Sequence, residues 1–272
     1  MSKLTFKNTK HPYHILASSP WPFIVSMQVF VLLIGFALYM HNFSLGGFTA
    51  LLGLVSVICS LYCWWCDIVL ESTHWRQHTT YIQKGLRYGM LLFILSEIMF
   101  FFSFFWAFFH SSISPSIQIG GIWPPLGVHT LDPWGLPLFN TILLLSSGIF
   151  ATYAHHTIKD FAINGSAGAS LVDLVHMSTE DINNFIKQHS KAYAQIGFSL
   201  CCAIALGVCF TFVQLYEYKH ASFTISDSIY GAVFYMATGF HGLHVLIGTI
   251  FLIVITLRFY KHHFLGRFFF WC

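Results

Sequence analysis

The sequence predicts an all-α polytopic membrane protein, a bundle of transmembrane helices, and three observations support this. Of the 272 residues, 56% are hydrophobic and only 8% are charged, whereas a soluble domain carries about 25% charged residues. The apolar residues gather in six runs, each close to the roughly 20 residues that a helix needs to cross the hydrocarbon core. Lys and Arg are distributed unevenly between the connections. We therefore expect a single membrane domain covering residues 1–272.

Each apolar run is expected to form one helix, because a continuous helix satisfies its own backbone hydrogen bonds in lipid. The predicted spans are residues 21–40, 46–65, 86–109, 137–154, 192–216 and 229–259. A tight turn is expected at 41–45. The connection 111–136 contains several prolines and glycines, which predicts an irregular loop.

The connection between the fourth and fifth spans, residues 159–191, has its own pattern. The string NGSAGAS at 164–170 predicts a flexible stretch. Ser178 and Asp181 have the spacing of a helix-capping box, and Ile182 and Phe185 then fall on one helical face. We expect an extended loop on the inner side of the membrane, ending in a short amphipathic helix.

The orientation follows from the positive charges, which concentrate on the inner side of membranes. With six spans, the two termini and two of the connections share one side. That side holds twelve of the thirteen Lys and Arg residues, and the other side has only Lys219. The asymmetry predicts that both termini lie inside.

Glu97 lies in the middle of the third span, with no charged residue within several turns. An ionisable side chain at that depth is costly, so it is a functional candidate. Two interpretations stay open at this point. Glu97 could be a proton-exchanging carboxyl, or it could be a protonated acid that hydrogen-bonds across a helix interface.

Histidines in the spans are weaker candidates. His241 and His244 are three residues apart and face the same side of the sixth span, so a metal pair is conceivable. No other span offers an obvious carboxylate or histidine to complete it, which favours polar packing between helices. His155 and His156 lie at the inner end of the fourth span, where an interfacial role is expected.

A polar cluster flanks the inner ends of the spans. Trp suits the headgroup layer and cations suit lipid phosphates, so the cluster predicts phospholipid binding; ordinary positive-inside anchoring is the alternative. Its members are Trp65, Glu71, His78, Lys84, Arg87, Arg258 and Lys261. With a net charge of +3 and no basic run, nothing points to nucleic acid. No nucleotide loop or Ser/His/Asp set is recognisable, so we expect no catalytic centre in this chain.

Six strings, spread in order over nearly the whole chain, resemble cytochrome c oxidase subunit III. They begin at Glu71 (ESTHWRQHT), Gln83 (QKGLRYGMLLFILSE), Phe104 (FFWAFFHSS), Gly120 (GGIWPPLGVHTLDPWGLPLFNT), Leu215 (LYEYKHASFTISDSIYG) and Ala237 (ATGFHGLHVLIGTIFLIV).

The resemblance implies an accessory subunit of the oxidase in the mitochondrial inner membrane, with both termini in the matrix. In that family the subunit packs against subunit I, and subunit II and smaller subunits complete the complex. Haem a and copper belong to partner subunits, and this chain is expected to hold no metal. Phospholipids such as cardiolipin, phosphatidylglycerol or phosphatidylethanolamine are expected in a V-shaped cleft. The positions matching the family's lipid contacts are Trp65, Glu71, His78, Arg87 and Arg258, and Glu97 matches its carbodiimide-reactive carboxyl.

The family role implied is to stabilise the catalytic core and to support proton uptake. The chain departs from the family at HHFLGRFFFWC, residues 262–272, where a seventh helix would follow. We expect a separate polypeptide to supply that helix, or the helix to be absent. Two rival functions make different demands: a proton channel through Glu97 needs further polar residues along a path, and a haem-binding cytochrome needs His241 or His244 as a ligand.

Overall fold

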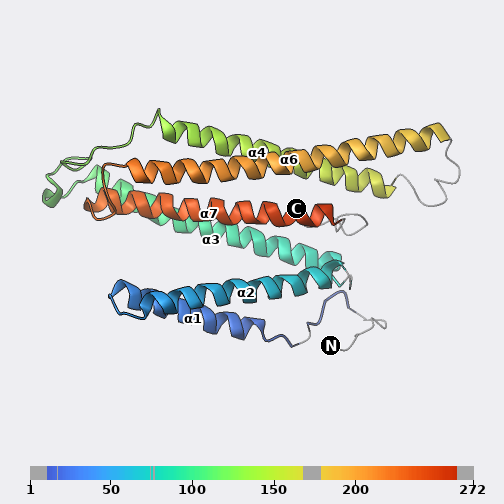
Figure 1. Ribbon diagram of the computed structural model, residues 1–272, viewed down its shortest axis with the longest axis horizontal. Helices are drawn as coiled ribbons and strands as arrows, with labels where there is room; N and C mark the ends of the chain where they lie inside the picture. The colour runs from blue at the N-terminus through green and yellow to red at the C-terminus, as the bar shows by residue number, and fades with distance from the viewer. Residues whose placement is uncertain (1–10, 17, 74, 76, 168–178, 262–272) are drawn as a thin grey trace. The chain divides into compact units, whose positions relative to one another are not determined.

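Helices make up all the regular structure in the part of the chain described by the computed structural model, residues 11–16, 18–73, 75, 77–167 and 179–261. Six of these helices are long and apolar enough to span a membrane, which confirms the predicted class (Figure 1). They are α1 (Trp21–Met40), α2 (Gly46–Thr73), α3 (Thr80–Ile113), α4 (Leu136–Ala167), α6 (Thr179–His220) and α7 (Ser228–Tyr260). A short 3₁₀ helix, η1 (Ile117–Ile119), interrupts the otherwise irregular α3–α4 connection, as predicted. The chain divides into two compact units, 1–91 and 92–272, with the boundary inside α3.

The first unit is built on a hairpin of α1 and α2, which run side by side (Figure 1). The predicted tight turn is confirmed. Backbone amides of His41 and Phe43 donate to the carbonyls of Ala37 and Leu38 at 3.1 and 3.0 Å. Asn42 takes φ +60°, a left-handed conformation that Asn tolerates better than most residues. The turn therefore reverses the chain within five residues.

Small residues let α1 and α2 approach closely. A Cβ on Gly53 would lie 2.7 Å from the backbone nitrogen of Leu32, and one on Gly35 would lie 2.7 Å from Ala50 Cα. Real Cβ atoms do not approach backbone atoms so closely. In a membrane, where lipid tails are as apolar as leucine, such close backbone packing is a main source of helix association.

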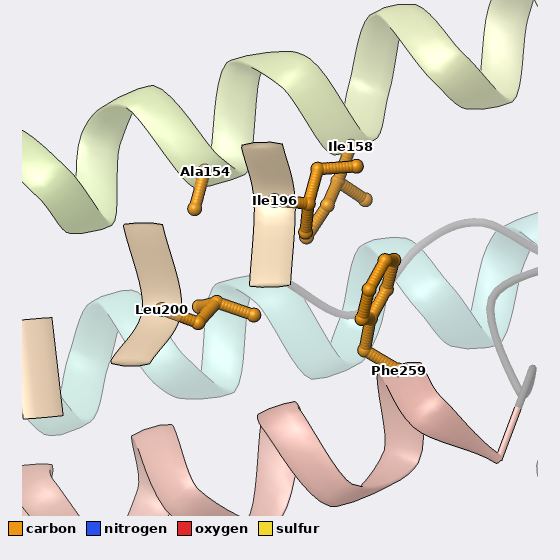
Figure 2. Close-up of a cluster of buried hydrophobic side chains, with 5 residues drawn as sticks. All are labelled: Ala154, Ile158, Ile196, Leu200 and Phe259. Atoms are coloured by element: carbon orange, nitrogen blue, oxygen red, sulfur yellow. The ribbon is translucent and has the colours of Figure 1, made fainter. Parts of the chain in front are cut away.

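The second unit has its hydrophobic core between α4, α6 and α7 (Figure 2). Ala154 and Ile158 of α4, Ile196 and Leu200 of α6, and Phe259 of α7 are all at most 4% exposed. The Tyr193 ring stacks on Phe259 with centroids 4.4 Å apart. This cluster holds the three helices together near one end.

Hydrogen bonds join the same helices elsewhere. Ser147 of α4 donates from Oγ to the Ala203 carbonyl of α6 at 2.9 Å. Gln214 of α6 donates from Nε2 to the Thr238 carbonyl of α7 at 2.9 Å. Both are contacts between different helices, where a lost partner would leave a polar group in an apolar setting.

Helix lengths differ from the predicted spans, and most of the helices extend well beyond the apolar runs. The predicted loop at 159–191 is corrected: α4 continues to Ala167, and α6 begins at Thr179 and runs without a break into the fifth span. The expected short surface helix is thus the start of α6. Ser178 and part of the NGSAGAS string lie outside the described residues. Helical hydrogen bonds are local and continue past the edge of the hydrocarbon. Hydropathy marks only the part of a helix that lies inside the hydrocarbon.

Candidate functional site

The first candidate site lies at the end of α2, in the first unit. After this helix the chain folds back on its last turn: the amides of Trp75 and Gln77 donate to the carbonyls of Leu70 and Glu71 at 3.1 and 3.0 Å. The buried Gln83 side chain donates to the His78 carbonyl at 3.0 Å. These bonds bring His78 back beside Glu71, seven residues earlier in the chain.

The segment before α1 packs against the same place. Thr79 donates from Oγ1 to the Pro12 carbonyl at 2.6 Å. The rings of Tyr13 and Tyr81 lie 6.5 Å apart, and those of His14 and His78 lie 6.4 Å apart. His14 is thereby placed with Glu71 and His78, although it is 57 positions from Glu71 (71 − 14).

Two imidazoles and one carboxylate therefore meet. One nitrogen each of His14 and His78 and one oxygen of Glu71 all lie within 4.8 Å of one another. His78 is 8% exposed. Burial lowers the pKa of the His78 imidazole, and the neighbouring His14 lowers it further. A neutral imidazole keeps a lone pair that accepts a hydrogen bond or ligates a cation.

The predicted lipid-contact residues fall in both units. Trp65 lies on α2 with half of its surface exposed, and Arg87 lies in the third turn of α3, exposed. The first unit contains Trp65 and Arg87 as well as Glu71 and His78. Arg258 lies in the last turn of α7, in the second unit. The structure brings Glu71 and His78 together, and it adds His14, which sequence reasoning missed. The only available signal was the His-rich string HPYH just before the first span.

The second candidate site pairs Glu97 with His244, within the second unit. Glu97 Oε2 lies 2.5 Å from His244 Nε2, and each side chain is about one third exposed. His244 Nδ1 lies 2.6 Å from the Phe240 carbonyl. A carbonyl only accepts, so Nδ1 carries a proton and Nε2 faces the carboxyl. A proton between Nε2 and Oε2 completes the hydrogen bond.

An apolar hollow surrounds this pair. It has a volume of about 460 Å³ and is lined, besides Glu97 and His244, by Phe93, Ile94, Ile98, Phe101, Phe102 and Phe105. The Phe101 ring packs edge-on against the His244 imidazole, with centroids 5.3 Å apart. Low local polarity strengthens a hydrogen bond between two polar groups. The site can therefore hold a proton between two side chains while presenting apolar walls.

The pairing bears on two expectations from the sequence. Glu97 of α3 hydrogen-bonds to His244 of α7, whereas its protonation and its exchange of protons both stay predictions. The expectation that no span supplies a carboxylate for the histidines of α7 is wrong for His244, because Glu97 is that carboxylate. His241 instead packs its ring edge-on against Phe210, at 5.7 Å between centroids.

A polar path through the spans finds little support. Four serines in the spans, which could contribute to such a path, have hydroxyls that bond to carbonyls of their own helices: Ser56 to Gly53, Ser96 to Phe93, Ser103 to Phe100 and Ser146 to Ile142. Such internal bonds are typical of serines in membrane helices. They leave Glu97 and His244 as a local pair.

Comparison with known proteins agrees with the resemblance. A family model described as "Cytochrome c oxidase subunit III" matches residues 11–198 and 182–270. The chain is similar to proteins named cytochrome c oxidase subunit 3: 46% identical to that of Prototheca wickerhamii, covering 94% of this chain and 86% of the relative. It is 45% identical to the protein of Triticum aestivum, covering 94% of this chain and 88% of the relative. It is 42% identical to that of Drosophila yakuba, covering 94% of this chain and 86% of the relative. With six membrane-spanning helices and matches over nearly its whole length, the chain belongs to the cytochrome c oxidase subunit III family.

Proposed function

We propose that this chain binds phospholipid at the end of α2 and thereby stabilises subunit I of cytochrome c oxidase and supports proton uptake. Family membership makes it an accessory subunit of that oxidoreductase complex in the mitochondrial inner membrane. The haem and copper chemistry belongs to the partner subunits under this proposal. The observation that supports the lipid role is the meeting of Glu71 and His78 at the α2–α3 connection, with Trp65 on α2 and Arg87 on α3 to either side of it in the sequence.

The length of α2 supports a position at headgroup depth. Its 28 residues extend about 42 Å at 1.5 Å per residue, against a hydrocarbon core of about 30 Å. The last turns, including Glu71, therefore reach past the hydrocarbon. A headgroup there would find a carboxylate and an imidazole for its hydroxyl or amine, and a guanidinium for its phosphate.

Arg258 is proposed as a separate phosphate contact at the end of α7. It occupies the last helical turn, where a cation also complements the partial negative charge of the helix end. The excess of Lys and Arg on one side supports an arrangement with both termini in the matrix. The lipid contacts would then lie in the matrix-facing leaflet.

The identity of the complex is tested by mild solubilisation of the native membrane and isolation of this chain. A haem a band in the visible spectrum and a partner with the mass of subunit I are the expected result. A colourless preparation of this chain alone would contradict the oxidase assignment and favour a free-standing transporter.

The lipid role is tested with Arg87→Gln in the purified complex, and Lys219→Gln serves as control. Lys219 lies in the last turn of α6, on the side predicted to face away from the matrix. Mass spectrometry of retained phospholipids should show a loss of about one lipid per complex in Arg87→Gln only. The same variant should inactivate sooner during turnover. Unchanged lipid content would contradict the proposal.

A further inference from the structure

We propose that His14, Glu71 and His78 bind a divalent transition-metal ion, Zn²⁺, at the junction of the N-terminal segment with the α2–α3 connection. The starting observation is their mutual distance: one ligand atom from each residue lies within 4.8 Å of the other two. The proposal goes beyond lipid binding and revises the expectation that this chain holds no metal.

The donor set fits zinc. Two imidazole nitrogens and a carboxylate oxygen form a common three-residue set for Zn²⁺, with bonds of about 2.0–2.2 Å and a fourth position left for water or another ligand. Donor atoms on a tetrahedral ion are then about 3.4 Å apart. The donor atoms are at most 4.8 Å apart, so binding requires them to close by about 1.4 Å or less. Ca²⁺ and Mg²⁺ prefer oxygen donors and fit less well.

The backbone around the three residues is held by bonds that do not involve the metal. Gln83 fixes the His78 carbonyl, and Thr79 fixes the Pro12 carbonyl two residues before His14. Glu71 lies in the last turn of α2. Each ligand therefore comes from a differently anchored segment, and the ion would find the three groups already gathered.

A second carboxylate adds negative charge close by. Asp67 lies one helical turn before Glu71, on the same face of α2, and its Oδ2 accepts a hydrogen bond from Trp21 Nε1 at 2.7 Å. This bond also ties the start of α1 to α2. Two carboxylates on one helix face attract a cation bound beside them.

The zinc and lipid proposals share Glu71 and His78 but not their other members. His14 belongs only to the metal site, whereas Arg87 and Trp65 belong only to the lipid site. Substitutions at His14 and at Arg87 therefore separate the two proposals.

The test uses the purified complex, depleted of loosely bound metal by a chelator and then exposed to buffered Zn²⁺. His14→Gln is compared with wild type and with His41→Gln, a control in the exposed turn after α1. Zinc is counted per haem by elemental mass spectrometry, so zinc elsewhere in the complex cancels in the difference. His14→Gln should contain one zinc fewer per complex, because the loss of a direct ligand should lower the affinity for Zn²⁺ by at least about 100-fold. Loss of a residue that only hydrogen-bonds to a ligand lowers it less. His41→Gln should lose none.

A further variant and a wild-type measurement keep the test decisive if His14→Gln does not assemble. His14→Cys supplies another zinc ligand and should retain the ion. In the wild-type complex, Zn²⁺ should slow modification of His14 by diethyl pyrocarbonate about tenfold or more, because ligation occupies the reactive nitrogen; His41 should react at an unchanged rate. Equal zinc content in His14→Gln and wild type, or no protection of His14, would overturn the metal site. Either result would leave the lipid proposal standing if Arg87→Gln still loses lipid.

Discussion

At the scale of single residues, the pair formed by Glu97 and His244 joins two groups that are 147 positions apart. Each alone would be costly in an apolar environment. Together each provides the other with a hydrogen-bond partner. The walls of the hollow are aromatic and aliphatic, and the second nitrogen of His244 contacts the Phe240 carbonyl.

Removing the imidazole should change the reactivity of the carboxyl. In His244→Phe, Glu97 loses the hydrogen bond that holds its Oε2 against the imidazole. Dicyclohexylcarbodiimide forms a bond to a carboxyl oxygen, so labelling of Glu97 in the purified complex should become several times faster once that oxygen is released. His241→Phe, one turn away, is the matched control. Equal labelling rates in His244→Phe and wild type would show that His244 does not restrain the Glu97 carboxyl.

At the scale of elements, α1 and α2 associate through close backbone contact, whereas α4, α6 and α7 combine a hydrophobic core with hydrogen bonds between helices. The difference is visible in the residues concerned. Gly35 and Gly53 leave no room for a side chain. In the second unit, Ser147 and Gln214 reach carbonyls of neighbouring helices.

Filling the contact between α1 and α2 should destabilise the hairpin. In Gly53→Ala, the new methyl group would overlap the Leu32 backbone, and overpacking of this kind costs about 1–3 kcal/mol. Gly148→Ala is the control, since a Cβ there meets no other group of the chain. Thermal unfolding of the solubilised complex, followed by release of this subunit, should start at lower temperature in Gly53→Ala alone. Equal behaviour of the two variants would contradict the close contact.

Two neighbouring serines allow a sharper comparison. Ser147 bonds across to α6, whereas Ser146 bonds within its own helix, to Ile142. Ser147→Ala should cost about 0.6 kcal/mol, the average for a hydrogen bond between membrane helices. Ser146→Ala should change the free energy of unfolding by less than that. Detergent titration of unfolding measures both, and a larger loss in Ser146→Ala would contradict the assigned bonds.

At the scale of the whole molecule, many large apolar side chains among the described residues are exposed. In the most apolar stretch of α3, none of the residues is buried inside the described part of the chain. Such faces suit lipid and other membrane subunits rather than water. This agrees with membership of a family of oxidase subunits.

The orientation belongs to this scale too. If both termini face the matrix, the turn after α1 faces the intermembrane space and the end of α7 faces the matrix. A membrane-impermeant maleimide should label His41→Cys in intact mitoplasts, and it should label Lys261→Cys only after permeabilisation. Both positions are exposed at helix ends, and wild type corrects for the native cysteines. The reverse pattern would invert the topology.

The sequence by itself determined the membrane environment, the all-helical class and the family, and it predicted the six long apolar helices found among the described residues. These depend on composition and on local apolar runs, and helical hydrogen bonds are formed within each run. Tertiary structure decided the pairing of Glu97 with His244 and the meeting of His14 with Glu71 and His78. Each of these meetings depends on the rotation of a helix about its axis or on the path of a connection. Interactions between residues distant in the chain decide both, so no local pattern encodes them.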